Sequence, residues 1–288
     1  MASMRDIKRR QMSVTSTQQI TKAMKLVATV KLQKAKARAE RNKPYFTGLY
    51  KTICSILSKT ENVDHKYLKD NGSDRKAVIV ITSNKGLAGG YNSNIVKEVV
   101  NAGFKTEDVD IYAVGRKGVE GLGRKGYRIV EDYSEAINEP LYKDAMEITK
   151  KVLRSFTDGE VGEIYMAYTN FKNTVSQEAR LIKLLPLNMD ELPAPEEDGS
   201  EDLVLMNYEP EADEALSSLI PKYISNLLYG AFIEALASEN GARMQAMDSA
   251  TTNADNMIAE LSLSYNRARQ ASITQELTEI IAGSEAIS

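Results

Sequence analysis

The chain has 288 residues, enough for one or two domains that each bury a hydrophobic core. Charged residues make up 27% and apolar residues 42%, the usual balance of a globular protein, and no apolar run approaches the roughly 18 residues of a membrane span. A single cysteine, Cys54, excludes an internal disulfide bond.

Residues 1–59 predict one long helix that begins near Ser3, with Asp6 three residues on as in a capping box. No glycine or proline interrupts the segment before Pro44, where we expect the helix to bend and then continue. Apolar residues at spacings of three and four predict the buried stripe: Ile20, Ala23, Met24, Val27, Val30 and Ala37.

The same segment is strongly basic. It holds fourteen Lys and Arg residues against Asp6 and Glu40, a charge of +12, which leaves −15 for the rest of the chain because the net charge is −3. A basic arm is typical of proteins that bind nucleic acid or membranes. It is also typical of a solvated helix face that pairs with an acidic neighbour, and the sequence favours this second interpretation.

Residues 60–74 form a polar connection that contains His65, the only histidine, for which we expect a surface position. From residue 75 to 190 strands and helices alternate, which predicts an α/β domain with a mostly parallel sheet. The link between the last two strands is too short for a crossover helix, so the fifth strand is expected to be antiparallel. The expected strands are 77–82, 110–115, 127–133, 163–169 and 178–187, with helices after the first and over 141–156.

Residues 191–211 lie within an acidic, proline-rich segment and are predicted to form a return loop. Residues 212–288 then predict a helix with a narrow, alanine-rich stripe, which suits one close partner helix. The stripe consists of Leu216, Ile220, Tyr223, Leu227, Ala231, Ala235, Ala242, Ala246, Ala250, Ala254, Met257, Leu261, Ile273, Leu277 and Ile280.

Two long helices at the ends of one chain are expected to pair as an antiparallel coiled coil. The C-terminal helix is the longer, so its last turns should extend past the N-terminal one as a single helix. That would expose Ile273, Leu277, Ile280 and Ile281. An apolar tip without a partner implies another protein around it.

Two glycine-containing motifs resemble phosphate-binding loops. Gly121, Gly123 and Gly126 match G-x-G-x-x-G, but they precede a strand, which is the wrong context for a dinucleotide. The loop 85–90 lies between a strand and a helix but lacks P-loop spacing, so a tight turn for close packing is the favoured interpretation. His65 has no second ligand type nearby. We therefore expect no catalytic, metal or cofactor site, while a nucleotide-binding α/β enzyme stays open as a weaker alternative.

Five segments are specific to one family: RDIKRRQMSVTSTQQITKAMKLVA (5–28), TSNKGLAGGYNSNI (82–95), YEP (208–210), ASENGARMQAM (237–247) and YNRARQASITQELTEI (265–280). They resemble the gamma subunit of the bacterial F-type rotary ATP synthase, in the same order and over essentially the whole chain. Because no transit peptide precedes Ser3, the bacterial form is expected.

The resemblance implies a non-catalytic central shaft without cofactors. It implies a ring of three alpha and three beta subunits around the shaft, an epsilon subunit, and a c-subunit ring through which alone the shaft meets the membrane. The location implied is the cytoplasmic face of the bacterial cell membrane, and nucleic acid is not an implied partner. The implied sheet order is 3-2-1-4-5, and the implied role is to couple ion-driven rotation to ATP synthesis, or ATP hydrolysis to ion pumping.

The resemblance also implies roles for individual residues. Contacts with beta are implied for Met24, Lys25, Arg243, Arg269, Gln270 and Thr274, an apolar bearing tip for Ile273, Leu277 and Ile280, and a foot near the c ring and epsilon for Tyr208 and Glu209. For Met24, plain packing within the helix pair is an equal alternative. The main alternative function is a free-standing basic coiled-coil protein that binds nucleic acid.

Overall fold

The computed structural model describes residues 4–59, 65–187 and 212–285. Its contacts divide the chain into two compact units. We call Met1–Thr29 with Arg243–Ser288 the paired-helix unit, and Val30–Ala242 the sheet unit. Two long helices, α1 (Met4–Lys59) and α5 (Ala212–Glu285), contribute to both units. The predicted cap at Ser3 and the end of the predicted C-terminal helix, 286–288, lie outside the described residues.

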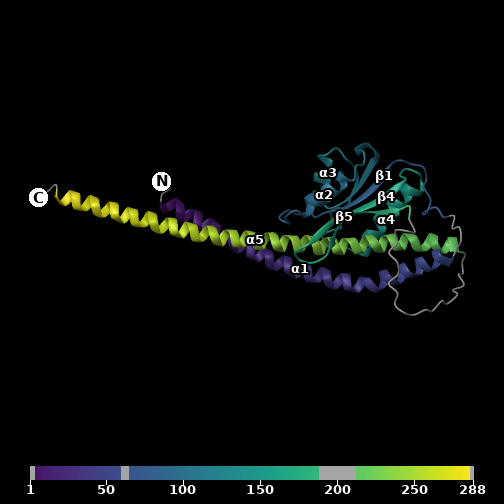
Figure 1. Cartoon of the computed structure of the whole chain (residues 1–288), viewed down its shortest axis with the longest axis horizontal. Helices are drawn as coiled ribbons and strands as arrows, with labels where there is room; N and C mark the ends of the chain where they lie inside the picture. Colours follow the sequence, from purple (N-terminus) through teal and green to yellow (C-terminus); the bar gives the residue numbers. More distant parts are fainter. Residues whose placement is uncertain (1–3, 60–64, 188–211, 286–288) are drawn as a thin grey trace. The chain divides into compact units, whose positions relative to one another are not determined.

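The sheet unit contains a five-stranded sheet in the order β3-β2-β1-β4-β5, of which Figure 1 labels β1, β4 and β5. Its strands are β1 (Lys76–Ile81), β2 (Val109–Val114), β3 (Arg128–Asp132), β4 (Glu163–Phe171) and β5 (Gln177–Leu185). The β1–β2, β1–β4 and β2–β3 pairs are parallel and the β4–β5 pair is antiparallel. The predicted mixed α/β sheet with an antiparallel last strand is therefore confirmed.

Helices cover both faces of this sheet. Successive strand residues point to opposite faces, so alternate residues of β1 enter two different cores. Ala77, Ile79 and Ile81 pack into a core with α4 (Tyr142–Thr157) and with sheet-unit residues of α1 and α5. Val78 and Val80 pack into a second core with α2 (Tyr91–Asn101) and α3 (Arg116–Gly123). A short 3₁₀ helix, η1 (Thr106–Asp108), precedes β2.

Helix α3 was not predicted from the sequence, because its glycines are poor helix formers. The structure shows why two of them are there. A Cβ atom at Gly118 would lie 2.9 Å from the Thr82 hydroxyl oxygen, and one at Gly121 would lie 2.8 Å from a Val96 methyl group. These glycines let α3 pack closely against the end of β1 and against α2.

One further expectation needs correction. His65 is not a surface residue: it is 1% exposed, its Nε2 lies 2.9 Å from the Ser217 hydroxyl, and its Nδ1 accepts a hydrogen bond from the Tyr67 amide. Ser217 on α5 and the nearby Tyr67 amide thus provide partners for both ring nitrogens. Helix α1 continues through Pro44, as expected.

The Glu163 carboxylate is bound by two lysines of neighbouring strands. At the start of β4 it accepts hydrogen bonds from Lys76 on β1 and, at 2.7 Å, from Lys183 on β5. Burial alone would raise the pKa of Glu163, but the two ammonium groups outweigh this and lower the pKa to about 2. Because the pKa is depressed in the folded chain, the stabilisation is present above the ordinary value of 4.5 and is lost as pH falls from there toward 2.

We predict that Glu163→Gln lowers the free energy of unfolding by about 2 kcal/mol at neutral pH, because it removes the charge that binds two lysines. The difference from the unsubstituted chain should shrink as pH falls from 4.5 toward 2. Urea unfolding of the full chain across this range measures it. Glu178→Gln is the matched control, since Glu178 also pairs with Lys172 and Arg180 but is exposed. An equal difference at all pH values would contradict the prediction.

Candidate functional site

In the paired-helix unit, α1 and α5 are joined by polar contacts. Gln11 Nε2 donates to Ser262 Oγ at 2.9 Å, Gln18 bonds Asp255, the hydroxyls of Thr21 and Thr251 are 2.8 Å apart, and Lys25 Nζ donates to Asp248 Oδ1 at 2.6 Å. From Gln11 to Lys25 the chain advances fourteen residues along α1, and the partners go back fourteen residues along α5, from Ser262 to Asp248. The two helices are therefore antiparallel and in one continuous register, as predicted.

Small side chains form the seam between these helices. On α1, Thr21 and Ala28 are buried, Ala28 to 1% exposure, and on α5 Ala254 and Met247 are buried. Ala246 and Ala250 of the predicted stripe are half-buried, whereas Met257 is 39% exposed. The alanine stripe of α5 thus faces α1, and small residues allow the two backbones to approach closely.

The stripe predicted on α1 is wrong in phase. Ile20 and Val27 are each 57% exposed, Ala23 is exposed and Met24 is half-buried. In the sheet unit, the stripe members Val30 and Ala37 are exposed as well. On α1 of the paired-helix unit the buried residues, Thr21 and Ala28, are small, and the larger apolar residues Ile20, Leu26 and Val27 are exposed. The predicted residues do recur with a helical period, but they form an exposed apolar face of α1 and not the face that packs against α5.

The paired-helix unit therefore presents an exposed apolar surface on both helices. Level with the start of α1 at Met4 lies Arg269, by the register above, so α5 continues past the described part of α1. Such a surface is typical of a protein interface. Its members are Met12, Ile20, Leu26 and Val27 on α1 and Leu263, Ile273, Leu277, Ile280 and Ile281 on α5.

The polar residues singled out by sequence occupy two levels of this unit. Lys25 is paired with Asp248, which is five residues from Arg243 along α5, so the two cations are separated by roughly one and a half helical turns. Arg243 is half-buried. Arg269, Gln270 and Thr274 are exposed. The Thr274 hydroxyl donates to the Gln270 carbonyl oxygen at 2.9 Å. Tyr208 and Glu209 lie outside the described residues.

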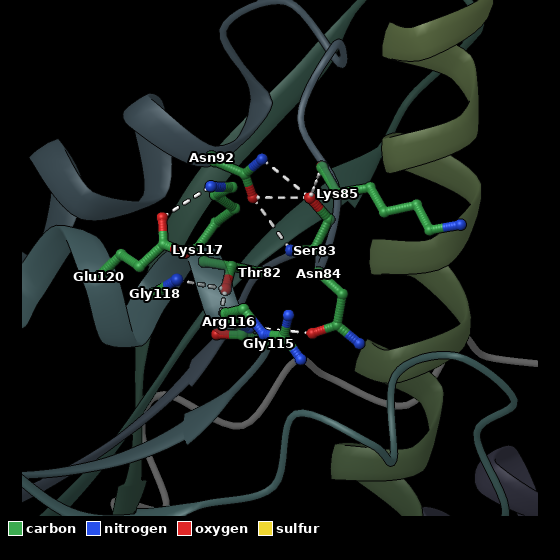
Figure 2. A network of polar contacts seen from close by, with 10 residues as sticks. All are labelled: Thr82, Ser83, Asn84, Lys85, Asn92, Gly115, Arg116, Lys117, Gly118 and Glu120. Atoms are coloured by element: carbon green, nitrogen blue, oxygen red, sulfur yellow. Dashed lines mark hydrogen bonds and ion pairs between the residues drawn. The ribbon is translucent and has the colours of Figure 1, made fainter.

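The loop after β1 is the second place where sequence suggested a ligand site, and Figure 2 shows its polar groups bonded to one another. Asn92 Oδ1 accepts from the Ser83 amide at 2.9 Å, and Asn92 Nδ2 donates to Ser83 Oγ at 2.8 Å. The Gly118 amide near the start of α3 donates to Thr82 Oγ1 at 2.8 Å. Thr82, Ser83 and Asn92 thus form a close-packed junction of β1 with α2 and α3. Residues 85–87 and 89–90 of the loop itself are exposed, and a Cβ atom at Gly86 or Gly89 would meet nothing within 4 Å, so the close packing lies at the ends of the loop.

Glycine geometry supports the same conclusion. Gly115 has φ of 119°, and a Cβ atom there would lie 2.2 Å from the Thr82 carbonyl oxygen, so only glycine fits. Of the G-x-G-x-x-G residues, Gly121 and Gly123 belong to α3 and Gly126 lies in the turn before β3. The predicted order, with the motif before a strand, is confirmed.

The described residues contain neither a metal-binding cluster nor a membrane-spanning helix. Within residues 4–59, 65–187 and 212–285, no cluster of three or more His, Cys, Asp or Glu side chains has the arrangement to hold a metal ion. No helix in those ranges is both long enough and apolar enough to cross a membrane.

Comparison with known proteins identifies the family. The family model described as ATP synthase matches residues 3–287. The ATP synthase gamma chain of Lachnoclostridium phytofermentans is 64% identical over all of both chains. The sodium ion specific ATP synthase gamma chain of Acetobacterium woodii is 43% identical over 99% of each chain.

Solved structures agree with the fold. A chain of the Euglena gracilis mitochondrial ATP synthase, in a structure of its OSCP, F1 and c-ring, has a TM-score of 0.69 at 19% identity and covers 99% of this chain and 94% of its own. A chain of the Tetrahymena thermophila mitochondrial ATP synthase, in its central stalk and c-ring, has a TM-score of 0.59 at 25% identity, covering 80% of this chain and 99% of its own.

We predict that Ala28→Leu destabilises the helix pair by about 1–3 kcal/mol, because the added atoms must fit a closely packed seam. Ala23→Leu on the same helix should change stability little, since Ala23 is exposed. Thermal unfolding followed by circular dichroism at 222 nm measures both. The reverse order of effects would restore the phase predicted from sequence and contradict the seam described here.

Proposed function

The chain belongs to the ATP synthase gamma-chain family, and on that premise we propose that it is the central rotor shaft of a bacterial F-type ATP synthase. The observation that carries this function is the antiparallel helix pair. Small residues are buried between its two helices, and apolar residues are exposed on its outside. Such a pair suits an element that turns inside a sleeve formed by other subunits. A free-standing nucleic-acid-binding protein finds no support among the relatives.

The shaft couples two processes that differ in energy per event. One elementary charge that crosses about 100 mV yields only roughly 2.3 kcal/mol, too little to form a phosphoanhydride. Several ion steps must therefore be collected by the c ring and delivered through a stiff element. Two paired helices are stiff, and their unlike faces bias each beta subunit differently as the shaft turns, so that the sites pass in sequence through states of different affinity.

The proposed division of labour follows the chain. Residues 1–59 and 212–288 form the shaft helices, residues 75–190 the α/β domain, and residues 191–211 an acidic return loop. Three alpha and three beta subunits surround the shaft, and epsilon and the c ring meet its foot. The Euglena and Tetrahymena structures, which contain F1, the central stalk and the c-ring, support the F1 and c-ring partners of this proposal.

The chemistry of ATP belongs to the neighbouring subunits in this proposal, and this chain is a non-catalytic part of a proton- or sodium-transporting ATPase. What supports it here is the loop after β1, where Ser83 and Asn92 are bonded to each other. The complex is membrane-associated, and we place the chain at the cytoplasmic face of the cell membrane, where it reaches the bilayer only through the c ring.

Three groups of residues carry the proposed contacts. Met24, Lys25 and Arg243 meet an acidic lever of beta at one level of the shaft. Arg269, Gln270 and Thr274 form a polar catch with beta nearer the tip. Exposure of Arg269, Gln270 and Thr274 supports this assignment, as does the position of Arg243 within roughly one and a half turns of the Lys25–Asp248 pair. Ile273, Leu277 and Ile280 form the bearing tip, and Tyr208 with Glu209 the foot.

The direct test is affinity purification of the tagged full chain from its own cells. We expect alpha and beta subunits in a fixed ratio to the tagged chain, with ATPase activity in the eluate. A tagged chain that elutes alone, or with nucleic acid that is released by salt, would contradict the proposal, because counterion release makes nucleic-acid binding steeply salt-dependent.

Deletion of residues 273–288 is predicted to lower both the yield of assembled ATPase and the torque of single rotating complexes, because the apolar tip is lost. The sheet unit should stay folded by circular dichroism. The matched control replaces Gln275 and Glu279 by alanine, which keeps the tip and its length. Loss of the sheet on truncation, or normal torque, would show that the tip does not act as proposed.

A further inference from the structure

A cavity of about 480 Å³ lies within the sheet unit, between α1, α5 and the strands β4 and β5. Every residue around it falls in Val30–Ala242. Asn226, Gly230 and Glu234 share one face of α5, since they are four residues apart. Glu40 and Phe46 line it from α1, and Tyr168 from β4. None of the lining residues belongs to the exposed apolar surface of the paired-helix unit or to the loop after β1.

Two polar side chains in this cavity have atoms without partners. Asn226 is 0% exposed, and both its amide oxygen and its amide nitrogen have no hydrogen-bond partner among the described residues. The Glu234 Oε2 is buried and likewise unpartnered among them. A buried amide and a buried carboxylate left unpaired are costly, and in folded proteins such groups usually meet a ligand or water.

The charge of the lining indicates which ligand. Glu40 and Glu234 contribute two carboxyl groups, and no Lys, Arg or His is among the described residues that line the cavity. Burial raises the pKa of Glu234, and the charge of Arg180 on β5 and the backbone N–H of Phe171 oppose this rise. A cation in the cavity would favour the ionised carboxylate and supply the missing partner.

The rest of the lining is apolar and aromatic. Phe46 and Tyr168 present rings, and Met166, Ile182 and Leu227 present aliphatic side chains. Aromatic rings stabilise cations that lie over their faces, and apolar walls hold the body of a small organic molecule. A volume of this size fits such a molecule.

We propose that this cavity is a binding site for a small organic ammonium ion with an apolar body. Glu234 accepts a charge-assisted hydrogen bond from the ammonium group, and the Asn226 amide orients the ligand by a second hydrogen bond. Phe46 and Tyr168 enclose its apolar part. The site does not depend on the proposed shaft function.

Three probes of similar size and different charge test this proposal on the full chain: 2-phenylethylamine, 2-phenylethanol and 3-phenylpropanoate. Titration calorimetry and ligand-observed NMR measure their binding. We expect the amine to bind more tightly than the alcohol, and the acid not to bind. Equal binding of amine and alcohol, preference for the acid, or no binding of any probe would overturn the proposal.

Two variants locate the site. Glu234→Gln keeps the shape and should weaken amine binding about tenfold, since a charge-assisted hydrogen bond becomes neutral, while it leaves alcohol binding unchanged. Gly230→Leu should abolish binding of both. A Cβ atom at Gly230 meets only Asn42 Nδ2, at 3.9 Å, so the helix accepts the side chain and the cavity is filled.

Gly48→Leu is the matched control for Gly230→Leu. Gly48 is an exposed helical glycine on α1, and a Cβ atom there meets nothing within 4 Å. Circular dichroism shows whether each variant is folded. Amine binding that survives both Glu234→Gln and Gly230→Leu in folded protein would place the ammonium ion elsewhere and overturn the assignment.

Discussion

Close approach of two antiparallel helices is the constraint on which the paired-helix unit depends. Small buried residues such as Ala28 on α1 and Ala254 on α5 allow the two backbones to approach closely, and Met247 is the larger side chain buried beside them. In the sheet unit the same two helices meet through Leu32, Ala35 and Ala237. A small-residue seam buries little apolar surface per turn. Polar contacts such as Thr21 with Thr251 then contribute to the register as much as to the stability.

The outward apolar residues follow from the same constraint. Side chains such as Ile20, Leu26 and Val27 have no place in the seam and remain exposed on the isolated chain. Burying one such side chain contributes about 1.5–3 kcal/mol, and that gain is realised only when another protein covers it. Folding of the pair and assembly of the complex are therefore thermodynamically linked, since a partner that binds only the folded pair stabilises it.

Sequence period identified the elements better than it identified their faces. The alternation of strands and helices from residue 77 onward predicted the sheet, because buried parallel strands are short, continuous apolar runs. On α1 the period selected Ile20 and Val27, which are exposed, and missed Ala28, which is buried. A helix with partners on two sides carries two apolar stripes, and hydrophobicity alone favours the larger residues over the small ones that form the closer contact.

Tertiary contacts explain the other misses. The glycines of α3 lower its helix propensity, and their reason lies in Thr82 and Val96, residues distant along the chain. The burial of His65 depends on Ser217, more than one hundred residues away. The cavity at Asn226 was equally out of reach, because its lining is assembled from α1, α5 and two strands. Local sequence patterns do not indicate contacts between residues that are distant along the chain.

Two polar clusters of the sheet unit differ in whether their polar atoms have hydrogen-bond partners, and this difference distinguishes a packing cluster from a candidate binding site. At the end of β1, Thr82, Ser83 and Asn92 are bonded to groups of the same chain, and the cluster fixes the positions of α2 and α3. Asn226 and Glu234 line a cavity, and the Asn226 amide atoms and the Glu234 Oε2 lack such partners among the described residues. A satisfied network rigidifies a fold. Unsatisfied groups destabilise it unless something else binds them, and a leucine at position 226 would avoid the cost altogether. In the binding site proposed above, the ligand supplies the partner that this amide lacks within the described chain.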